Sequence, residues 1–72
     1  MSVYQRLKDI REDFDKTQAE IARVIGTSQS YYAQYENGKR TIPFERMAIL
    51  AKYYNISLDY FAGFIDTPRK LK

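Results

Sequence analysis

The chain has 72 residues and a mass of 8.5 kDa, which is enough for one small domain and leaves no room for a second core. Cysteine and histidine are both absent, which excludes disulfides, thiolate or imidazole metal sites and nucleophile–histidine catalysis. With 44% apolar and 29% charged residues and no long apolar run, the sequence predicts a globular cytoplasmic protein without a membrane-spanning segment.

The net charge of +3 comes from the C-terminal end of the chain. Residues 1–68 contain nine Lys or Arg and nine Asp or Glu, so the whole surplus lies in Arg69, Lys70 and Lys72. The basic isoelectric point therefore says little about a nucleic-acid partner. A DNA-binding surface would have to come from the local arrangement of side chains.

The first predicted helix spans about residues 2–14. Its apolar residues repeat at spacings of four, three and four, which is typical of an amphipathic helix with one buried stripe: Val3, Leu7, Ile10 and Phe14. We expect this helix to stop near Asp15, because a short polar residue can adopt a left-handed backbone conformation at modest cost.

The next two predicted helices are short and closely spaced. Thr17-Gln18-Ala19-Glu20 has the pattern of a capping box, and Gly26 supplies the positive φ that ends the second helix. Ser28 is a good N-cap for a third helix over residues 29–36, and Asn37-Gly38 is a strong stop. Two short helices joined by a tight turn with glycine, here over residues 18–36, are the layout of a DNA-binding helix-turn-helix.

The two sides of the third predicted helix differ in composition. At 100° per residue, Tyr32 and Tyr35 share one side and are predicted core residues. The outward side carries amide, hydroxyl and methyl groups and no charge, which is unusual for a face that is only solvated. Its residues are Gln29, Ser30, Ala33 and Gln34.

Two further helices are predicted after the basic loop Lys39-Arg40-Thr41. Pro43 is expected at the first position of the fourth helix, and Asn55 is its expected cap. Ser57 starts a short fifth helix, which we expect to end at Gly63. The predicted inward residues of these two helices are Phe44, Met47, Leu50, Ala51, Tyr54, Leu58 and Phe61.

Two segments resemble a known family. Residues 18–30, QAEIARVIGTSQS, and residues 35–40, YENGKR, are similar to the Cro/C1-type (Xre-like) helix-turn-helix regulators of bacteria and phages. The resemblance covers about residues 3–63. It implies an all-α fold, with a compact five-helix lambda-repressor-like DNA-binding domain over residues 1–63. Residues 64–72 are then predicted to form a flexible basic tail.

The resemblance also implies structural roles at the end of the first helix. It implies that Arg11 and Glu36 form a structural ion pair, with contact between Arg11 and a DNA phosphate as the alternative. Relatives have glycine and then leucine before the Thr-Gln pair, where this chain has Asp15 and Lys16. We therefore expect Phe14 to take the place of the missing leucine.

The predicted DNA contacts combine side-chain chemistry with the resemblance. An amide can donate to and accept from the edge of adenine, and a methyl group can meet the methyl of thymine. Base contact is predicted for Gln29, Ser30, Ala33 and Gln34. Backbone contact is predicted for Gln18, Thr27, Tyr31, Asn37, Lys39, Arg40 and Thr41. The alternatives are solvated amides, Asn37 acting only as a helix cap, and Lys39 and Arg40 only making the loop soluble.

Together, these features predict a sequence-specific regulator of transcription, with repression as the first interpretation. It would bind an inverted-repeat operator in double-stranded DNA as a homodimer, with residues 29–36 in the major groove. The alternative is a protein-interaction module or antitoxin of the same fold, whose main partner is a protein such as a toxin. No enzymatic activity, cofactor, metal or membrane partner is expected.

Two other features leave alternatives open. The eleven aromatic residues exceed what one core of this size can hide, so an exposed patch on the fourth and fifth helices would suit a dimer interface. Ordinary partial exposure is the other interpretation. The start at Met1 suits either a complete small regulator or the N-terminal domain of a longer one.

Overall fold

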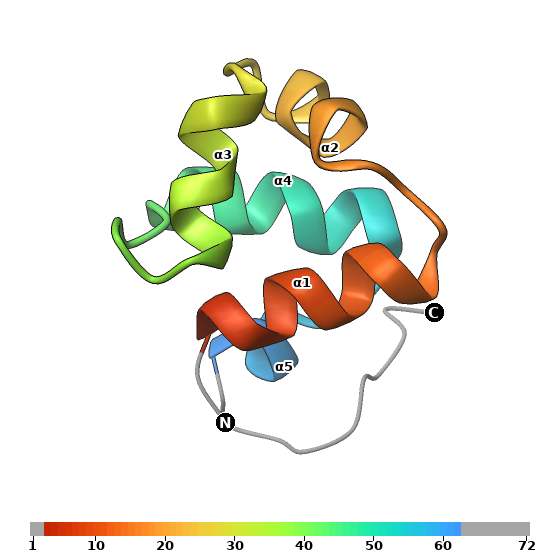
Figure 1. Ribbon diagram of the computed structural model, residues 1–72. Helices are drawn as coiled ribbons and strands as arrows, with labels where there is room; N and C mark the ends of the chain where they lie inside the picture. Colours follow the sequence, from red (N-terminus) through yellow and green to blue (C-terminus); the bar gives the residue numbers. More distant parts are fainter. Residues whose placement is uncertain (1–2, 63–72) are drawn as a thin grey trace.

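The computed structural model describes residues 3–62, which fold into five helices. In chain order they are α1 (Val3–Asp13), α2 (Gln18–Val24), α3 (Gln29–Glu36), α4 (Phe44–Tyr54) and α5 (Leu58–Ala62). In the view of Figure 1, α4 crosses the middle of the molecule, with α2 above it, α1 below it and α3 to one side. The predicted all-α fold is therefore confirmed.

The helices begin and end where the local sequence signals indicate. Thr17 and Glu20 form both bonds of the capping box that starts α2. Three of the expected turns use left-handed backbone conformations, with φ of 54° at Asp15, 77° at Gly26 and 59° at Asn55. Asp15 and Asn55 tolerate this conformation better than most residues with a side chain, which is why short polar residues can end α1 and α4.

All five helices contribute side chains to one hydrophobic core. The ring of Tyr32 and the side chain of Leu50 are fully buried, and Phe61 of α5 closes the core beside Tyr54. The core residues are Leu7, Ile10, Ile21, Ala22, Ile25, Tyr32, Tyr35, Ile42, Leu50, Ala51, Tyr54, Ile56, Tyr60 and Phe61. The predicted core positions of Tyr32, Tyr35, Tyr54 and Phe61 are thus confirmed.

A buried arginine joins the first and last helices. The Arg6 side chain of α1 is 2% exposed, and its Nη1 donates to the backbone oxygen of Tyr60 at 2.9 Å. The guanidinium carbon also lies 4.5 Å from the centroid of the Tyr60 ring. Tyr60 is consequently buried, which removes it from the exposed aromatic patch that we considered for the fourth and fifth helices.

Three expectations for apolar positions need correction. Pro43 has an extended backbone and is the N-cap of α4, so the helix begins one residue later than predicted. Phe44 is 67% exposed instead of buried, because Ile42, just before the helix, fills this end of the core. Phe14 lies beyond the end of α1 and stays 44% exposed, although its ring packs edge-on against Tyr54 with centroids 4.9 Å apart.

Some predicted features lie outside the described residues. They are the side chain of Val3, the end of the fifth helix at Gly63, and the basic tail 64–72. Within residues 3–62, no helix has the length and apolar character needed to cross a membrane.

Candidate DNA-binding face

The turn between α2 and α3 fixes the angle at which α3 leaves the domain. Gly26 has a φ of 77°, and the next amide, of Thr27, donates to the backbone oxygen of Ala22 at 2.9 Å. Ser28 then caps α3, because its Oγ accepts from the amide of Tyr31 at 3.1 Å. One side of α3 is held in the core by Tyr32 and Tyr35. The opposite side is thereby presented outward.

The structure brings the four predicted base-contacting residues together on that outward side. Gln29 and Ser30 are exposed in the first turn, and Ala33 and Gln34 are partly exposed one turn later. We call this set, Gln29, Ser30, Ala33 and Gln34, the outward face of α3. It carries no formal charge, so it can approach a surface that presents both hydrogen-bond donors and acceptors.

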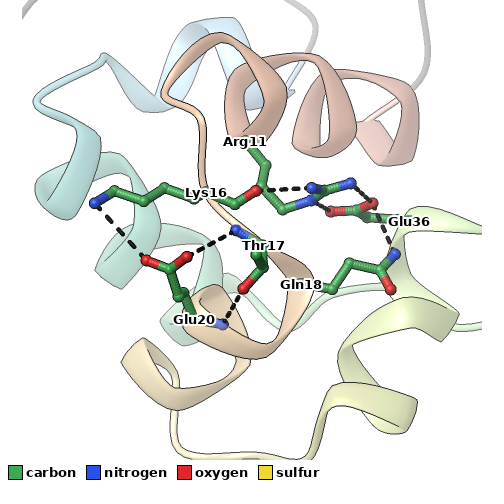
Figure 2. A network of polar contacts seen from close by, with 6 residues as sticks. All are labelled: Arg11, Lys16, Thr17, Gln18, Glu20 and Glu36. Atoms are coloured by element: carbon green, nitrogen blue, oxygen red, sulfur yellow. Dashed lines mark hydrogen bonds and ion pairs between the residues drawn. The ribbon is translucent and has the colours of Figure 1, made fainter.

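A buried carboxylate ties α3 to the two preceding helices. Arg11 Nε donates to Glu36 Oε2 at 2.7 Å, and Arg11 Nη2 donates to Glu36 Oε1 at 3.0 Å. Figure 2 shows Gln18 reaching the same carboxylate from α2, where its Nε2 donates to Glu36 Oε1 at 3.1 Å. Arg11 Nη1 also donates to the backbone oxygen of Lys16 at 2.8 Å. The network therefore holds α1, the following loop, α2 and α3 in one arrangement.

The same contacts set the ionisation of Glu36. Burial alone would raise the pKa of its carboxyl, but the hydrogen bonds from Arg11 and Gln18 and the positive charge of Arg11 outweigh burial. The pKa of Glu36 therefore lies below its ordinary value. The hydrogen bond to Glu36 correspondingly raises the pKa of Arg11.

This lowered pKa predicts a loss of stability in acid. The Glu36 contribution is fully present above its ordinary pKa of 4.5, and it is lost as the pH falls through the lower folded-state value. We expect the urea midpoint of the protein to fall as the pH drops below 4.5, with a steeper pH dependence in the wild type than in Glu36→Gln. Equal pH dependence in the two proteins would contradict this prediction.

The network also determines which atoms of Gln18 remain available. A carboxylate only accepts hydrogen bonds, so the amide nitrogen of Gln18 must face Glu36. One N–H and the amide oxygen of Gln18 are then left for other partners. This structural use of Gln18 was not predicted, although its contact with the DNA backbone stays a prediction.

The loop after α3 folds back onto the end of that helix. The amides of Lys39 and Arg40 donate to the backbone oxygen of Gln34 at 2.9 and 3.2 Å. Asn37 ends the helix, and its own amide donates to the backbone oxygen of Ala33. The remaining residues predicted to contact the DNA backbone lie around this end or in the turn before α3: Thr27 is partly exposed, and Asn37, Lys39, Arg40 and Thr41 are exposed.

Two arginines flank the ring of Tyr31 on α3. The guanidinium carbon of Arg40 lies 4.8 Å from the ring centroid, and that of Arg46 lies 5.7 Å from it. Arg46 comes from α4, and its Nη1 donates to the hydroxyl of Tyr35 at 2.9 Å. Sequence reasoning missed Arg46, because a single cation on an amphipathic helix gives no signal of the helix that it will contact. Within residues 3–62, no cluster of acidic side chains could hold a metal ion.

Comparison with known proteins identifies the family. A helix-turn-helix family model matches residues 7–61, which is more than half of the chain. The chain is 36% identical over 64 residues to the HTH-type transcriptional regulator YobD of Bacillus subtilis, covering 89% of this chain and 57% of YobD. It is 35% identical over 63 residues to the cryptic phage CTXphi transcriptional repressor RstR of Vibrio cholerae, covering 88% and 56%.

A further relative and a solved structure complete the comparison. The antitoxin PezA of Streptococcus pneumoniae is 34% identical over 53 residues, covering 74% of this chain and 34% of PezA. The chain thus spans about half or less of the length of these relatives. The crystal structure of the P22 c2 repressor in complex with a synthetic operator superposes with a TM-score of 0.78 at 22% identity, covering 86% of this chain and 94% of that one. The chain therefore belongs to the Cro/C1-type helix-turn-helix family of transcriptional regulators.

Proposed function

We propose that this chain is a sequence-specific DNA-binding domain of a transcriptional repressor, which places α3 in the major groove of double-stranded DNA. The observation that carries the proposal is the outward face of α3. Its four side chains are small or amide-bearing and uncharged, while Tyr32 and Tyr35 hold the other side of the helix in the core. A helix anchored in this way can enter a groove without loss of the fold.

The chemistry of the outward face suits base edges. The exposed amide of Gln29 can donate and accept together, which matches the N7 and N6 edge of adenine. Ser30 can bond a base or a phosphate, and the methyl of Ala33 allows a close approach to thymine. The DNA backbone on either side of the groove is contacted by a second set of residues: Gln18, Thr27, Tyr31, Asn37, Lys39, Arg40 and Thr41.

We further propose that two copies bind together on an inverted repeat. Only four side chains of one copy reach base edges, which is too few to discriminate one site from the many non-specific sites of a genome. Ile49 and Tyr53 lie one turn apart on the same side of α4, are both exposed, and are available for contact with a second copy. The repressor relative and the operator complex of P22 c2 support the choice of DNA as the partner.

Selection from random DNA duplexes at fixed, near-physiological salt tests the proposal. We expect enrichment of an inverted repeat whose half-sites are about 10–10.5 base pairs apart. Gln29→Ala should then weaken the preference at one position of each half-site by about 1–3 kcal/mol, because it removes one pair of base contacts. Gln5→Ala is the matched control, since Gln5 lies on α1 outside the helix-turn-helix. Equal selections by Gln29→Ala and the wild type would contradict the proposal.

The likeness to PezA supports a second candidate, a module whose main partner is a protein. The same selection separates the two. A folded wild-type protein that enriches no sequence would favour the protein-binding candidate.

A further inference from the structure

The side chain of Gln34 is already engaged on the outward face of α3. Its amide oxygen accepts from Arg40 Nε at 2.7 Å. An arginine side chain has donors but no acceptor, so the oxygen of Gln34, and not its nitrogen, must face Arg40. The amide nitrogen therefore points away from Arg40, and both of its hydrogens are left for another partner.

Two further contacts of Arg40 keep it in this position, and Arg46 packs against the same tyrosine ring. The backbone amide of Arg40 donates to the backbone oxygen of Gln34 at 3.2 Å, which places the two residues side by side. Its guanidinium carbon lies 4.8 Å from the centroid of the Tyr31 ring. Arg46 lies against the same ring at 5.7 Å and is itself bonded to the hydroxyl of Tyr35 at 2.9 Å. The tyrosine ring that supports Arg40 is thus also packed against Arg46 of α4.

Within the described part of the chain, no carboxylate forms an ion pair with Arg40. Glu36 pairs with Arg11 and Glu20 with Lys16 instead. The amide of Gln34 therefore presents its N–H groups beside an uncompensated cation. A cation bonded to the amide oxygen also polarises these N–H groups, which strengthens them as donors.

We infer that Arg40 is a positioning residue that sets base specificity through Gln34, by making the Gln34 side chain a reader of hydrogen-bond acceptors. The inference rests on the proposed function. A free glutamine bonds adenine through both amide atoms, since N6 donates to its oxygen and N7 accepts from its nitrogen. The Gln34 oxygen keeps a second lone pair, but the N6–H donor of adenine would have to approach it beside the positive charge of Arg40, which disfavours a donor and favours an acceptor. Guanine presents two acceptors, N7 and O6, and is favoured at this position.

This role differs from simple contact between Arg40 and a phosphate. A phosphate contact strengthens binding to all sequences, whereas a contact with Gln34 changes the preference at one base position. Lys39 provides the matched control, because it is an exposed cation in the same loop and its side chain forms no hydrogen bond or ion pair with α3 among the described residues. Arg40→Met and Lys39→Met remove the same charge, and only the first frees the oxygen of Gln34.

The test measures the affinity of each protein for two duplexes that differ only at the base position affected by Gln34→Ala, one with guanine and one with adenine. The proteins are the wild type, Arg40→Met, Lys39→Met, Gln34→Ala and the double variant Arg40→Met/Gln34→Ala. Wild type and Lys39→Met are expected to prefer guanine over adenine there. Arg40→Met should reduce that preference by about tenfold, and should have no further effect on it in the Gln34→Ala background. The inference is overturned if Arg40→Met weakens all duplexes equally, or if the wild type prefers adenine at this position.

A measurement without DNA separates the inference from the proposed function. The Nε–H proton of Arg40 should exchange slowly with water in the free protein, and faster in Gln34→Ala, as observed by NMR. Equal exchange in the two proteins would overturn the inference. Slow exchange in a wild-type protein that enriches no sequence would instead show that DNA binding, the proposed function, is wrong.

Discussion

Replacing Arg11 with methionine is expected to lower the free energy of unfolding by about 3–5 kcal/mol, the usual cost of leaving one member of a buried ion pair alone. The Glu36 side chain is 2% exposed, and Arg11 supplies two of its three hydrogen bonds from other side chains. A domain of this size has only about 4–10 kcal/mol of stability in total. The substitution is therefore expected to leave a large unfolded fraction at 37 °C.

Urea unfolding of matched variants measures this effect. Lys8→Met removes the same charge from an exposed position of α1 and should change the free energy of unfolding by less than about 0.5 kcal/mol. Adding Glu36→Gln to Arg11→Met should recover part of the loss, because the unpaired carboxylate is then gone. If Arg11→Met costs no more than Lys8→Met, the ion pair does not stabilise the fold.

Replacing Phe61 with alanine is expected to cost about 3–5 kcal/mol, as is usual for truncation of a fully buried ring. The Phe61 side chain has no exposed surface, and its ring lies among those of Tyr54 and Tyr60, with centroids 6.3 and 5.8 Å away. α5 contributes few residues to the core, so the loss of this ring should separate α5 from α1 and α4. The expected result is a strongly destabilised protein.

Thermal unfolding followed by circular dichroism provides the measurement. In domains of this size, each kcal/mol of lost stability lowers the unfolding temperature by about 4–8 °C. A loss of about 3 kcal/mol should therefore lower the unfolding temperature of Phe61→Ala by at least about 12 °C. Phe44→Ala is the matched control, because the same ring is 67% exposed there and should matter little. Similar unfolding temperatures for both variants would show that Phe61 does not close the core.

The sequence predicted the helices well because their ends depend on local chemistry. A capping box needs only a threonine hydroxyl and a glutamate three residues later, and the pair Thr17 and Glu20 forms one at the start of α2. The exposure of Phe44 depends instead on tertiary packing, which the local sequence does not indicate. Its spacing fits the inward face of α4, but Ile42 occupies that end of the core, and no periodicity indicates which of two apolar neighbours will do so.

In the candidate site, too, the features set by local sequence could be predicted and those set by tertiary packing could not. The position of Gln29, Ser30, Ala33 and Gln34 on one side of a helix follows from 100° per residue, and could be predicted. The use of Gln18 to bond Glu36, and of Gln34 to bond Arg40, could not. These bonds join residues whose separation is set by the packing of α2 against α3 and by the fold of the loop, and an amide can find a partner in many directions.

The separation between the two sides of α3 has a consequence for evolution. Tyr32, Tyr35 and Glu36 hold the helix through the core and the ion pair, and none of them belongs to the outward face. If α3 reads DNA as proposed, substitutions at Gln29, Ser30 or Ala33 alter which operator is chosen while leaving the scaffold intact. A gene encoding such a domain can diverge in target after duplication through a few codon changes, without first passing through unstable intermediates.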